Sequence, residues 1–396
     1  MLTGLQPLVA LVSLCVVGVS LAAQEVSSLQ VPPARLPQDM PVLTPLLSQG
    51  TDEPSLVEAA RPASDGAPRT RTERPPSLAP ATRPRSPVAR ERTGTAVRAW
   101  EQRRARLERD WQELMGAFPQ TRDPLKAEFL EREELATFTR QLVRYQVEEG
   151  VYTDGWLLVP KPAPARAPAM VVFHPTIATH TAQVSGRDSA NPEKMQGVQL
   201  VSRGYVVLCP RCFIFADGAD YLGHVKAMQA RHPGWTGMAR MTFDGIRAVD
   251  FLESLPCVDR NRIGGIGHSL GAKEVLYAAA FDPRYKVAVF SEGGIGLGFS
   301  NWDAEWYLGP RIKQPGFRHD NHELMALIAP RAFLLLAGES ADGDRSWAFV
   351  TAARPVYQLL GAAGELGWFN HRLGHRYPPN AQAIAEAFLD ERLKPR

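Results

Sequence analysis

One short segment constrains the fold of this chain more than any other: residues 267–271 read Gly-His-Ser-Leu-Gly. The segment follows an apolar run at 262–266, typical of a buried strand, and precedes a helix-like stretch at 272–280. A sharp turn between a strand and a helix holds its central residue in strained backbone geometry, and flanking glycines keep side chains from colliding there. The pattern therefore predicts a strand, a tight turn with Ser269 at its tip, and a helix.

From residue 142 onward, short apolar runs alternate with amphipathic stretches. We expect strands at 142–147, 155–159, 170–173, 205–209, 263–266, 287–291, 332–337 and 367–370. We expect helices at 193–202, 242–254, 272–280, 346–360 and 380–393. Near-continuous apolar strands separated by helices indicate a mostly parallel sheet that is covered on both faces. The fold class is therefore α/β, and its first two strands are expected to form a hairpin.

Ser269 stands where such a fold exposes a nucleophile, at the start of a helix whose N-terminal partial charge favours a developing anion. A serine hydroxyl is a weak nucleophile at neutral pH and needs a base that a carboxylate orients. In the order typical of this arrangement, the acid follows a later strand and the histidine follows the last one. His375 is the predicted base, because it lies in a loop just beyond the strand at 367–370 and follows Gly374. His371 is the alternative, although its position close to the strand also suits a packed residue.

The predicted acid is Asp342, which lies a few residues past the strand at 332–337 and immediately before Gly343. That placement suits a carboxylate that turns back toward His375. Asp344 and Glu339 stand nearby and are alternatives, and Glu292 offers a carboxylate from the end of a different strand.

An oxyanion hole needs two backbone N–H groups, each worth roughly 3 kcal/mol of transition-state stabilisation. Leu270 follows the nucleophile and is expected to provide one of them. The loop after the strand at 170–173 is expected to provide the other through Thr176, with Ile177 as the alternative, because Pro175 has no N–H to donate. In the insert between the strands at 287 and 332, Trp302 and Trp306 are candidate substrate-binding aromatics, although aromatic residues in a lid can equally serve packing.

The region from about residue 142 to the C-terminus resembles the dienelactone-hydrolase and acetyl-xylan-esterase-like branch of the α/β-hydrolases. The segments that carry the resemblance are 264–274, 290–294, 329–332 and 342–347. The resemblance implies the α/β-hydrolase fold and cofactor-free hydrolysis of carboxylic esters, often acetyl groups on carbohydrates. Many members have His-Gly after the first central strand, whereas this chain has His174-Pro175, which puts the second oxyanion donor in doubt.

The N-terminal part has a different composition. Residues 1–23 are interpreted as an export signal, because an apolar run at 8–21 leads into small residues, although no Lys or Arg precedes the run. An uncleaved anchor is the alternative. Residues 24–97 are rich in Pro, Ser, Thr, Ala and Arg and are predicted to be a disordered linker. The catalytic domain is predicted to span 98–396 and to begin with a helical extension at 98–141. The protein is therefore expected to be periplasmic or secreted, with no stable membrane span once the signal is cleaved.

The composition argues against several other partners. The formal net charge of +3 is small and much of it comes from the Arg-rich linker, so no nucleic-acid partner is expected. Cys209 and Cys212 have the spacing of a redox or zinc pair, but no second ligand pair stands at zinc-site spacing. A local disulfide or buried thiols are the simpler interpretations. Neither a metal nor a cofactor is expected, and the expected partner is a small-molecule or carbohydrate ester.

Three functions are consistent with these residues. An exported serine esterase is favoured. A serine peptidase of the prolyl-oligopeptidase-like type shares the same order of catalytic residues, but no propeller-sized domain precedes this one. A non-catalytic binding protein on the same fold is disfavoured because Ser269, Asp342 and His375 are all present. The ester that fits depends on the insert that carries Trp302 and Trp306.

Overall fold

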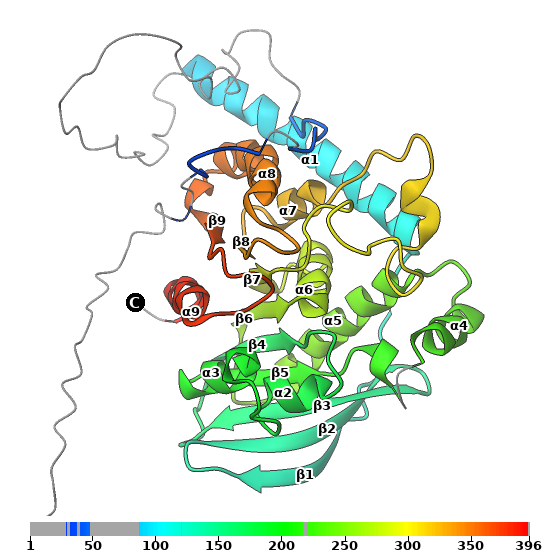
Figure 1. Ribbon diagram of the computed structural model, residues 1–396, viewed down its shortest axis with the longest axis vertical. Coiled ribbons are helices and arrows are strands. Elements are labelled where there is room, and N and C mark those ends of the chain that lie inside the picture. Colours follow the sequence, from blue (N-terminus) through cyan, green and yellow to red (C-terminus); the bar gives the residue numbers. More distant parts are fainter. Residues whose placement is uncertain are drawn as a thin grey trace, which may run out of the picture.

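The computed structural model describes residues 29, 32–37, 40–47, 87–119, 121–216 and 220–394. Within them, the strands are β1 Glu128–Glu134, β2 Phe138–Glu148, β3 Val151–Pro160, β4 Ala167–Phe173, β5 Val206–Pro210, β6 Val258–His268, β7 Tyr285–Ser291, β8 Ala332–Ala337 and β9 Leu366–Asn370. They form one sheet in the order β1-β2-β3-β5-β4-β6-β7-β8-β9 (Figure 1). The pairs β1–β2, β2–β3 and β3–β5 are antiparallel, and the others are parallel. The predicted α/β class and the initial hairpin are confirmed.

Helices cover both faces of this sheet. They are α1 Pro87–Met115, α2 His180–Val184, α3 Gln196–Ser202, α4 Tyr221–Arg231, α5 Gly237–Ser254, α6 Leu270–Phe281, α7 His322–Ile328, α8 Trp347–Leu359 and α9 Pro379–Leu393. The buried residues of α1, α5, α6, α7 and α8 join one apolar cluster, whereas those of α2, α3 and α9 join a second cluster. The sheet therefore separates two cores (Figure 1).

Strand β4 shows why the apolar runs are continuous. Val171 and Phe173 pack into the first cluster, and Met170 and Val172, which alternate with them, pack into the second. A strand covered on both faces gains about 1.5–3 kcal/mol from each fully buried aliphatic or aromatic side chain, so neither face favours polar residues. This burial fixes the strands whose ends carry the site.

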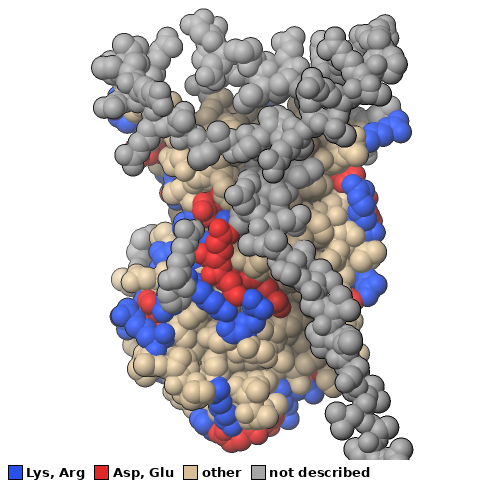
Figure 2. Space-filling view, turned by 90° about the vertical axis from the view of Figure 1, so that its left-hand side faces the viewer, with Lys and Arg blue, Asp and Glu red and all other residues tan. Residues whose placement is uncertain are grey.

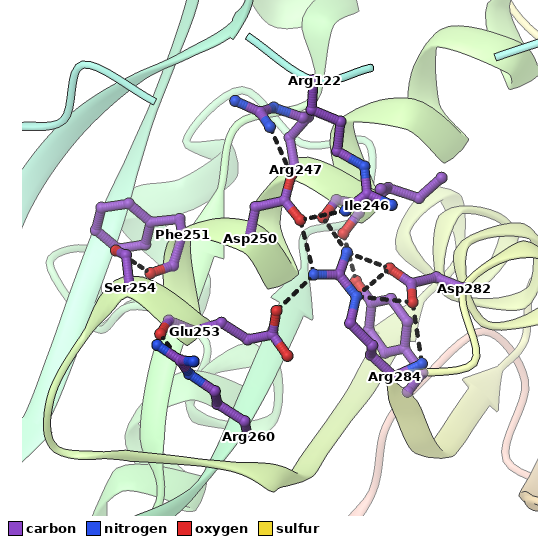
Figure 3. A network of polar contacts seen from close by, with 12 residues as sticks. Arg122, Ile246, Arg247, Asp250, Phe251, Glu253, Ser254, Arg260, Asp282 and Arg284 are labelled. Carbon is purple, nitrogen blue, oxygen red and sulfur yellow. Dashed lines mark hydrogen bonds and ion pairs between the residues drawn. The ribbon is translucent and has the colours of Figure 1, made fainter. Parts of the chain in front are cut away.

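Ion pairs attach α5 to the loop between α6 and β7. Figure 3 shows Arg284 between three carboxylates, and its guanidinium nitrogens lie 2.7 Å from carboxylate oxygens of Asp250, Glu253 and Asp282. Burial alone would lower the pKa of Arg284, but hydrogen bonds and charges from Asp282 and Asp250 raise it. Because α5 and α6 pack against each other, the network helps to hold the helix that follows Ser269.

Charges on the described surface are mixed in sign. On the face seen in Figure 2, acidic and basic side chains lie beside one another. Helix α9 lies on that side of the molecule and has such pairs, Arg203 with Glu386 at 3.2 Å and Arg392 with Glu365 at 2.6 Å. Interspersed charges of this kind do not produce the field of one sign that attracts a polyanion.

The prediction that 98–141 is a helical extension is wrong for the second half of that region. Helix α1 begins at Pro87, inside the predicted linker, and β1 follows it as an edge strand. The sequence pattern did not indicate β1, because most of its side chains are charged and almost all are exposed. Its ladder with β2 holds it in place. Helix α1 is attached by Trp111, whose indole N–H donates to Glu323 at 2.8 Å.

Residues 40–47 also depart from the predicted linker at 24–97. Leu46 is only 3% exposed and belongs to the first apolar cluster, against which Met40, Leu43 and Leu47 pack. The carbonyl oxygen of Thr44 lies 3.0 Å from Nε2 of His322, at the start of α7. Apolar side chains scattered through a Pro-rich segment can thus bind a large core although the segment cannot form one itself. The predicted signal at 1–23 lies outside the described residues.

Two further findings concern the thiols and the membrane. Among the described residues Cys209, Cys212 and Cys257 are free, and the first two are buried, so the buried-thiol interpretation holds for that pair. Burial raises the pKa of both thiols above the ordinary cysteine value. None of the helices in the described ranges is both long and apolar enough to cross a bilayer.

We predict that Leu46→Ala lowers the free energy of unfolding by about 2 kcal/mol, because it removes a buried side chain and leaves a gap. The matched control is Leu36→Ala, since Leu36 is 41% exposed, and a change within about 0.5 kcal/mol is expected for it. Denaturant midpoints of both variants measure the difference. Equal midpoints would mean that residues 40–47 contribute nothing to stability.

Candidate active site

Ser269 lies between β6 and α6 with φ 60° and ψ −118°, a conformation that costs energy for any residue other than glycine. The flanking glycines are required by close contacts. A Cβ at Gly267 would stand 2.1 Å from the carbonyl group of Gly271, and a Cβ at Gly271 would stand 2.1 Å from the carbonyl oxygen of Phe173. Neither contact can be relieved by a side-chain rotation, because the obstructing atoms belong to the backbone. The strained turn that the sequence predicts is present.

Glu292 follows β7 directly, and its carboxylate is completely buried. It accepts hydrogen bonds from the backbone N–H groups of Gly338, Ala341 and Asp342, and its Oε2 lies 3.4 Å from Nδ1 of His375. Burial by itself would raise the pKa of Glu292, but the contact with His375 and these N–H groups together lower it. Glu292 is therefore an ionised carboxylate facing the imidazole.

His375 extends from the loop after β9 and is 44% exposed. Its ring centroid lies 4.7 Å from that of His268, the residue before Ser269. Because Nδ1 faces Glu292, Nε2 on the other side of the ring is the nitrogen left to exchange a proton. The backbone N–H of Ser269 also donates to the carbonyl oxygen of Ser291 at 2.8 Å, and Ser291 is the residue before Glu292. The serine, the imidazole and this carboxylate thus gather at one edge of the sheet.

Asp342 has a different place from the one predicted. Its carboxyl oxygens accept the N–H groups of Gly294 at 3.0 Å and Ile295 at 2.6 Å, so it holds the loop after β7. Burial, followed by the nearby charge of Glu292, raises the pKa of Asp342 to about 7. A carboxyl group that is partly protonated near neutral pH stabilises an imidazolium poorly. The acid facing His375 in the structure is Glu292, which the sequence offered as a candidate from a different strand, and not Asp342.

Three more residues that the sequence suggested for the acid or the base have contacts away from His375. Asp344 and Glu339 both pair with Arg372, at 2.7 Å and 2.9 Å. His371 is buried, and its Nδ1 accepts the N–H of Leu373 at 3.1 Å, which is a packing role.

The loop after β4 contains Thr176, the predicted second oxyanion donor. The fully buried His174 accepts the N–H of Cys212 through Nε2 at 3.1 Å, so in its neutral form it carries the proton on Nδ1. Nδ1 lies 2.8 Å from the carbonyl oxygen of Pro175 and therefore donates to it. Burial lowers the pKa of His174 to about 3, which keeps the ring neutral. The carbonyl of Pro175 and the N–H of Thr176 share one peptide unit and point in opposite directions, so this bond orients the donor.

The two tryptophans of the insert differ. Trp302 is completely buried, and its indole N–H donates to the carbonyl of Gly294 at 2.7 Å. The prediction that Trp302 binds substrate is therefore wrong, since its ring has no exposed face. Trp306 is half-buried, and its ring centroid lies 5.5 Å from that of Tyr221.

Lys273 is a functional candidate that the sequence analysis missed. It lies one helical turn beyond Ser269, and its Nζ lies 3.1 Å from Oγ of Ser300 and 3.0 Å from Oδ1 of Asn301. The ammonium also stands over the ring of Tyr307, 4.0 Å from its centroid. Burial lowers the pKa of Lys273 to about 7. The available signal was a pair of charged residues, Lys273 and Glu274, in a helix that is otherwise largely apolar.

In the described part of the chain, no group of three or more His, Cys, Asp or Glu side chains is placed to hold a metal ion. The sheet order, the strained serine after β6 and the histidine after β9 define an α/β-hydrolase. Residues 154–315 match the family model described as "Dienelactone hydrolase family". This stretch of the chain is therefore similar to the dienelactone hydrolase family, and the resemblance seen in the sequence is confirmed.

Solved structures share this fold, and curated proteins are similar to part of the sequence. A glucuronoyl esterase from Solibacter usitatus superposes with a TM-score of 0.61 at 18% identity, covering 73% of this chain and 92% of that one. Among curated proteins, carbohydrate esterase MZ0003 from an unknown prokaryote is 27% identical over 33% of this chain. A 4-O-methyl-glucuronoyl methylesterase from Sodiomyces alcalophilus is 28% identical over 31% of this chain. The matched region spans only 35% and 30% of the length of these two relatives.

We predict that Glu292→Gln lowers kcat by about 10²- to 10⁴-fold, because the amide cannot stabilise a charged imidazole as a carboxylate does. Asp344→Asn is the control, since Asp344 pairs with Arg372, and it should leave kcat near the wild-type value. Asp342→Asn should mainly reduce stability, because it disturbs the loop after β7. The kcat values are compared at matched folded fraction, and a larger loss in the Asp342 variant than in the Glu292 variant would return the acid role to Asp342.

Proposed function

We propose that this protein is an exported serine hydrolase that cleaves carboxylic esters attached to carbohydrates, through an acyl-enzyme on Ser269. The observation that carries the proposal is the contact between the ionised Glu292 and His375, next to the strained turn at Ser269. A nucleophile, a base and an orienting acid at one edge of the sheet are the parts that acyl transfer requires.

In this mechanism, Nε2 of His375 takes the hydroxyl proton of Ser269 while Oγ attacks the ester carbonyl carbon. Negative charge develops on the carbonyl oxygen, where the N–H groups of Leu270 and Thr176 stabilise it. The carbon–oxygen bond to the alcohol then breaks, and His375 returns the proton to the departing alcohol. Water, activated by the same imidazole, hydrolyses the acyl-enzyme and releases the acid. Glu292 stabilises the imidazolium in both steps.

Carbohydrate esters are favoured because of the relatives. Two of them are named a carbohydrate esterase and a 4-O-methyl-glucuronoyl methylesterase, and each aligns with part of this chain. Export is part of the proposal because of the apolar run at 8–21, which fits a secretory signal. Polymeric carbohydrate substrates would be met outside the cytoplasm.

We predict that Ser269→Ala keeps the fold and lowers ester hydrolysis by on the order of 10⁴- to 10⁶-fold, because acyl transfer loses its nucleophile. The same change should abolish labelling by a fluorophosphonate probe, which reacts with activated serines. Near-wild-type hydrolysis by the variant would exclude Ser269 as the nucleophile. A parallel panel of nitrophenyl esters and aminoacyl-proline amides separates an esterase from a peptidase, and faster cleavage of the amides would favour the latter.

A further inference from the structure

A cavity of about 430 Å³ lies beside the oxyanion loop, and the mechanism above gives it no role. Its walls include Thr176, Ile177, His180, Arg211, Phe215 and Tyr221. We call it the loop cavity.

The position of the loop cavity relative to Ser269 follows from the sheet. Strands β4 and β6 are parallel neighbours, with Phe173 opposite Gly267, so Thr176 and Ser269 leave the same sheet edge a few residues later. Arg211 follows β5, on the far side of β4 from β6. The base, by contrast, is held by Glu292 at the end of β7, on the other side of β6. The loop cavity and the base thus lie on opposite sides of the nucleophile.

This arrangement indicates on which side of Ser269 each half of an ester binds. The imidazole must protonate the departing alcohol, so the alcohol lies on the side of His375. The acyl group then extends the other way, past the oxyanion donors and into the loop cavity.

Aromatic rings form one wall of the loop cavity. The ring centroids of Phe215 and Tyr221 lie 5.1 Å apart in an edge-to-face arrangement, and Tyr221 in turn packs edge-to-face with Trp306 at 5.5 Å. Ile177 adds aliphatic surface. A flat aromatic ring of a bound ligand can pack against these rings in the same offset or edge-to-face geometry.

His180 and Arg211 provide the polar part of the walls. His180 has a strained φ of 29°, and its Nδ1 accepts the N–H of Thr181 at 2.9 Å. The neutral ring therefore carries its proton on Nε2, which is a hydrogen-bond donor. Arg211 forms an ion pair with Asp154, so the guanidinium adds N–H donors while the pair as a whole has no net charge. These groups suit a neutral oxygen acceptor better than a carboxylate.

We propose that the loop cavity binds the acyl half of the ester and that this half is an aromatic acyl group with a hydroxyl or methoxy oxygen, of the hydroxycinnamoyl or hydroxybenzoyl class. The inference rests on the proposed function and names its acyl group. A uronoyl group is less suitable, because each of its several hydroxyls would need a partner on walls that are largely aromatic and aliphatic.

The test compares two esters that carry the same aromatic ring on opposite sides. Methyl ferulate has the ring in its acyl half, and coniferyl acetate has it in its alcohol half. We expect Tyr221→Ala to lower the ratio of kcat/KM for methyl ferulate over coniferyl acetate by about tenfold, since one aromatic contact of about 1.4 kcal/mol is lost. Ala178 also lines the loop cavity. Ala178→Trp should lower the ratio at least as much, because the larger side chain would occupy the space that the acyl ring needs.

Leu222→Ala is the matched control. Leu222 is the neighbour of Tyr221 on α4, is 46% exposed and is not part of the cavity wall, so the ratio should not change. An unchanged ratio in both cavity variants, or a wild-type enzyme that cleaves methyl glucuronate much faster than methyl ferulate, would overturn the inference.

A binding measurement separates this inference from the proposed function. In the Ser269→Ala background, methyl ferulate should bind measurably, and Tyr221→Ala should weaken its binding about tenfold. Binding that depends on Tyr221 without any turnover by the wild-type protein would contradict the proposed hydrolysis and retain the cavity assignment. Ester turnover together with binding that does not depend on Tyr221 would retain the hydrolase and contradict the cavity assignment.

Discussion

The carbonyl oxygen of Phe173, at the end of β4, lies directly against Gly271 in the first turn of α6, and no side chain fits between them. The contact brings the start of a helix over the ends of two parallel strands, with Ser269 at the corner. Since Phe173 ends β4, the loop that contains Thr176 begins at the same place. One steric constraint thus positions both the strained serine and the loop that is expected to face its oxyanion, and it depends on the two cores that hold β4 and β6 in register.

Two buried carboxyl groups, those of Glu292 and Asp342, have different roles at the site. Glu292 receives several backbone N–H groups and the imidazole, and its pKa falls in spite of burial. Burial, followed by the nearby charge of Glu292, raises the pKa of Asp342 to about 7. Keeping both carboxyl groups ionised so close together in a poorly solvated place would cost free energy. Their surroundings therefore give the two groups different pKa values. The group that stays charged faces the base, while the other supports the loop after β7.

Behind the oxyanion loop lies a set of buried polar groups that faces no solvent. His174 is kept neutral by burial and connects the N–H of Cys212 to the carbonyl of Pro175. Glu274, one position past Lys273 on α6, is also buried, and burial raises its pKa to about 8. Neutral, hydrogen-bonded groups such as the His174 ring cost little to bury and are rigid once their hydrogen bonds are made. They offer a way to fix a loop that contains a proline where many members of the family have glycine.

Local patterns in the sequence predict much of this protein. The turn at Ser269, the parallel strands and the initial hairpin follow from steric requirements and side-chain periodicity, which are properties of neighbouring residues. The edge strand β1, whose side chains are mostly charged and exposed, has no such periodicity. Residues 40–47 pack on the domain because a core distant in sequence accepts Leu46. The sequence by itself offered four carboxylates that precede His375 in the chain as candidates for the acid. Only the tertiary structure selected Glu292 and buried Trp302, because both depend on which strand ends and loops lie side by side, and burial and charge act through space rather than along the chain.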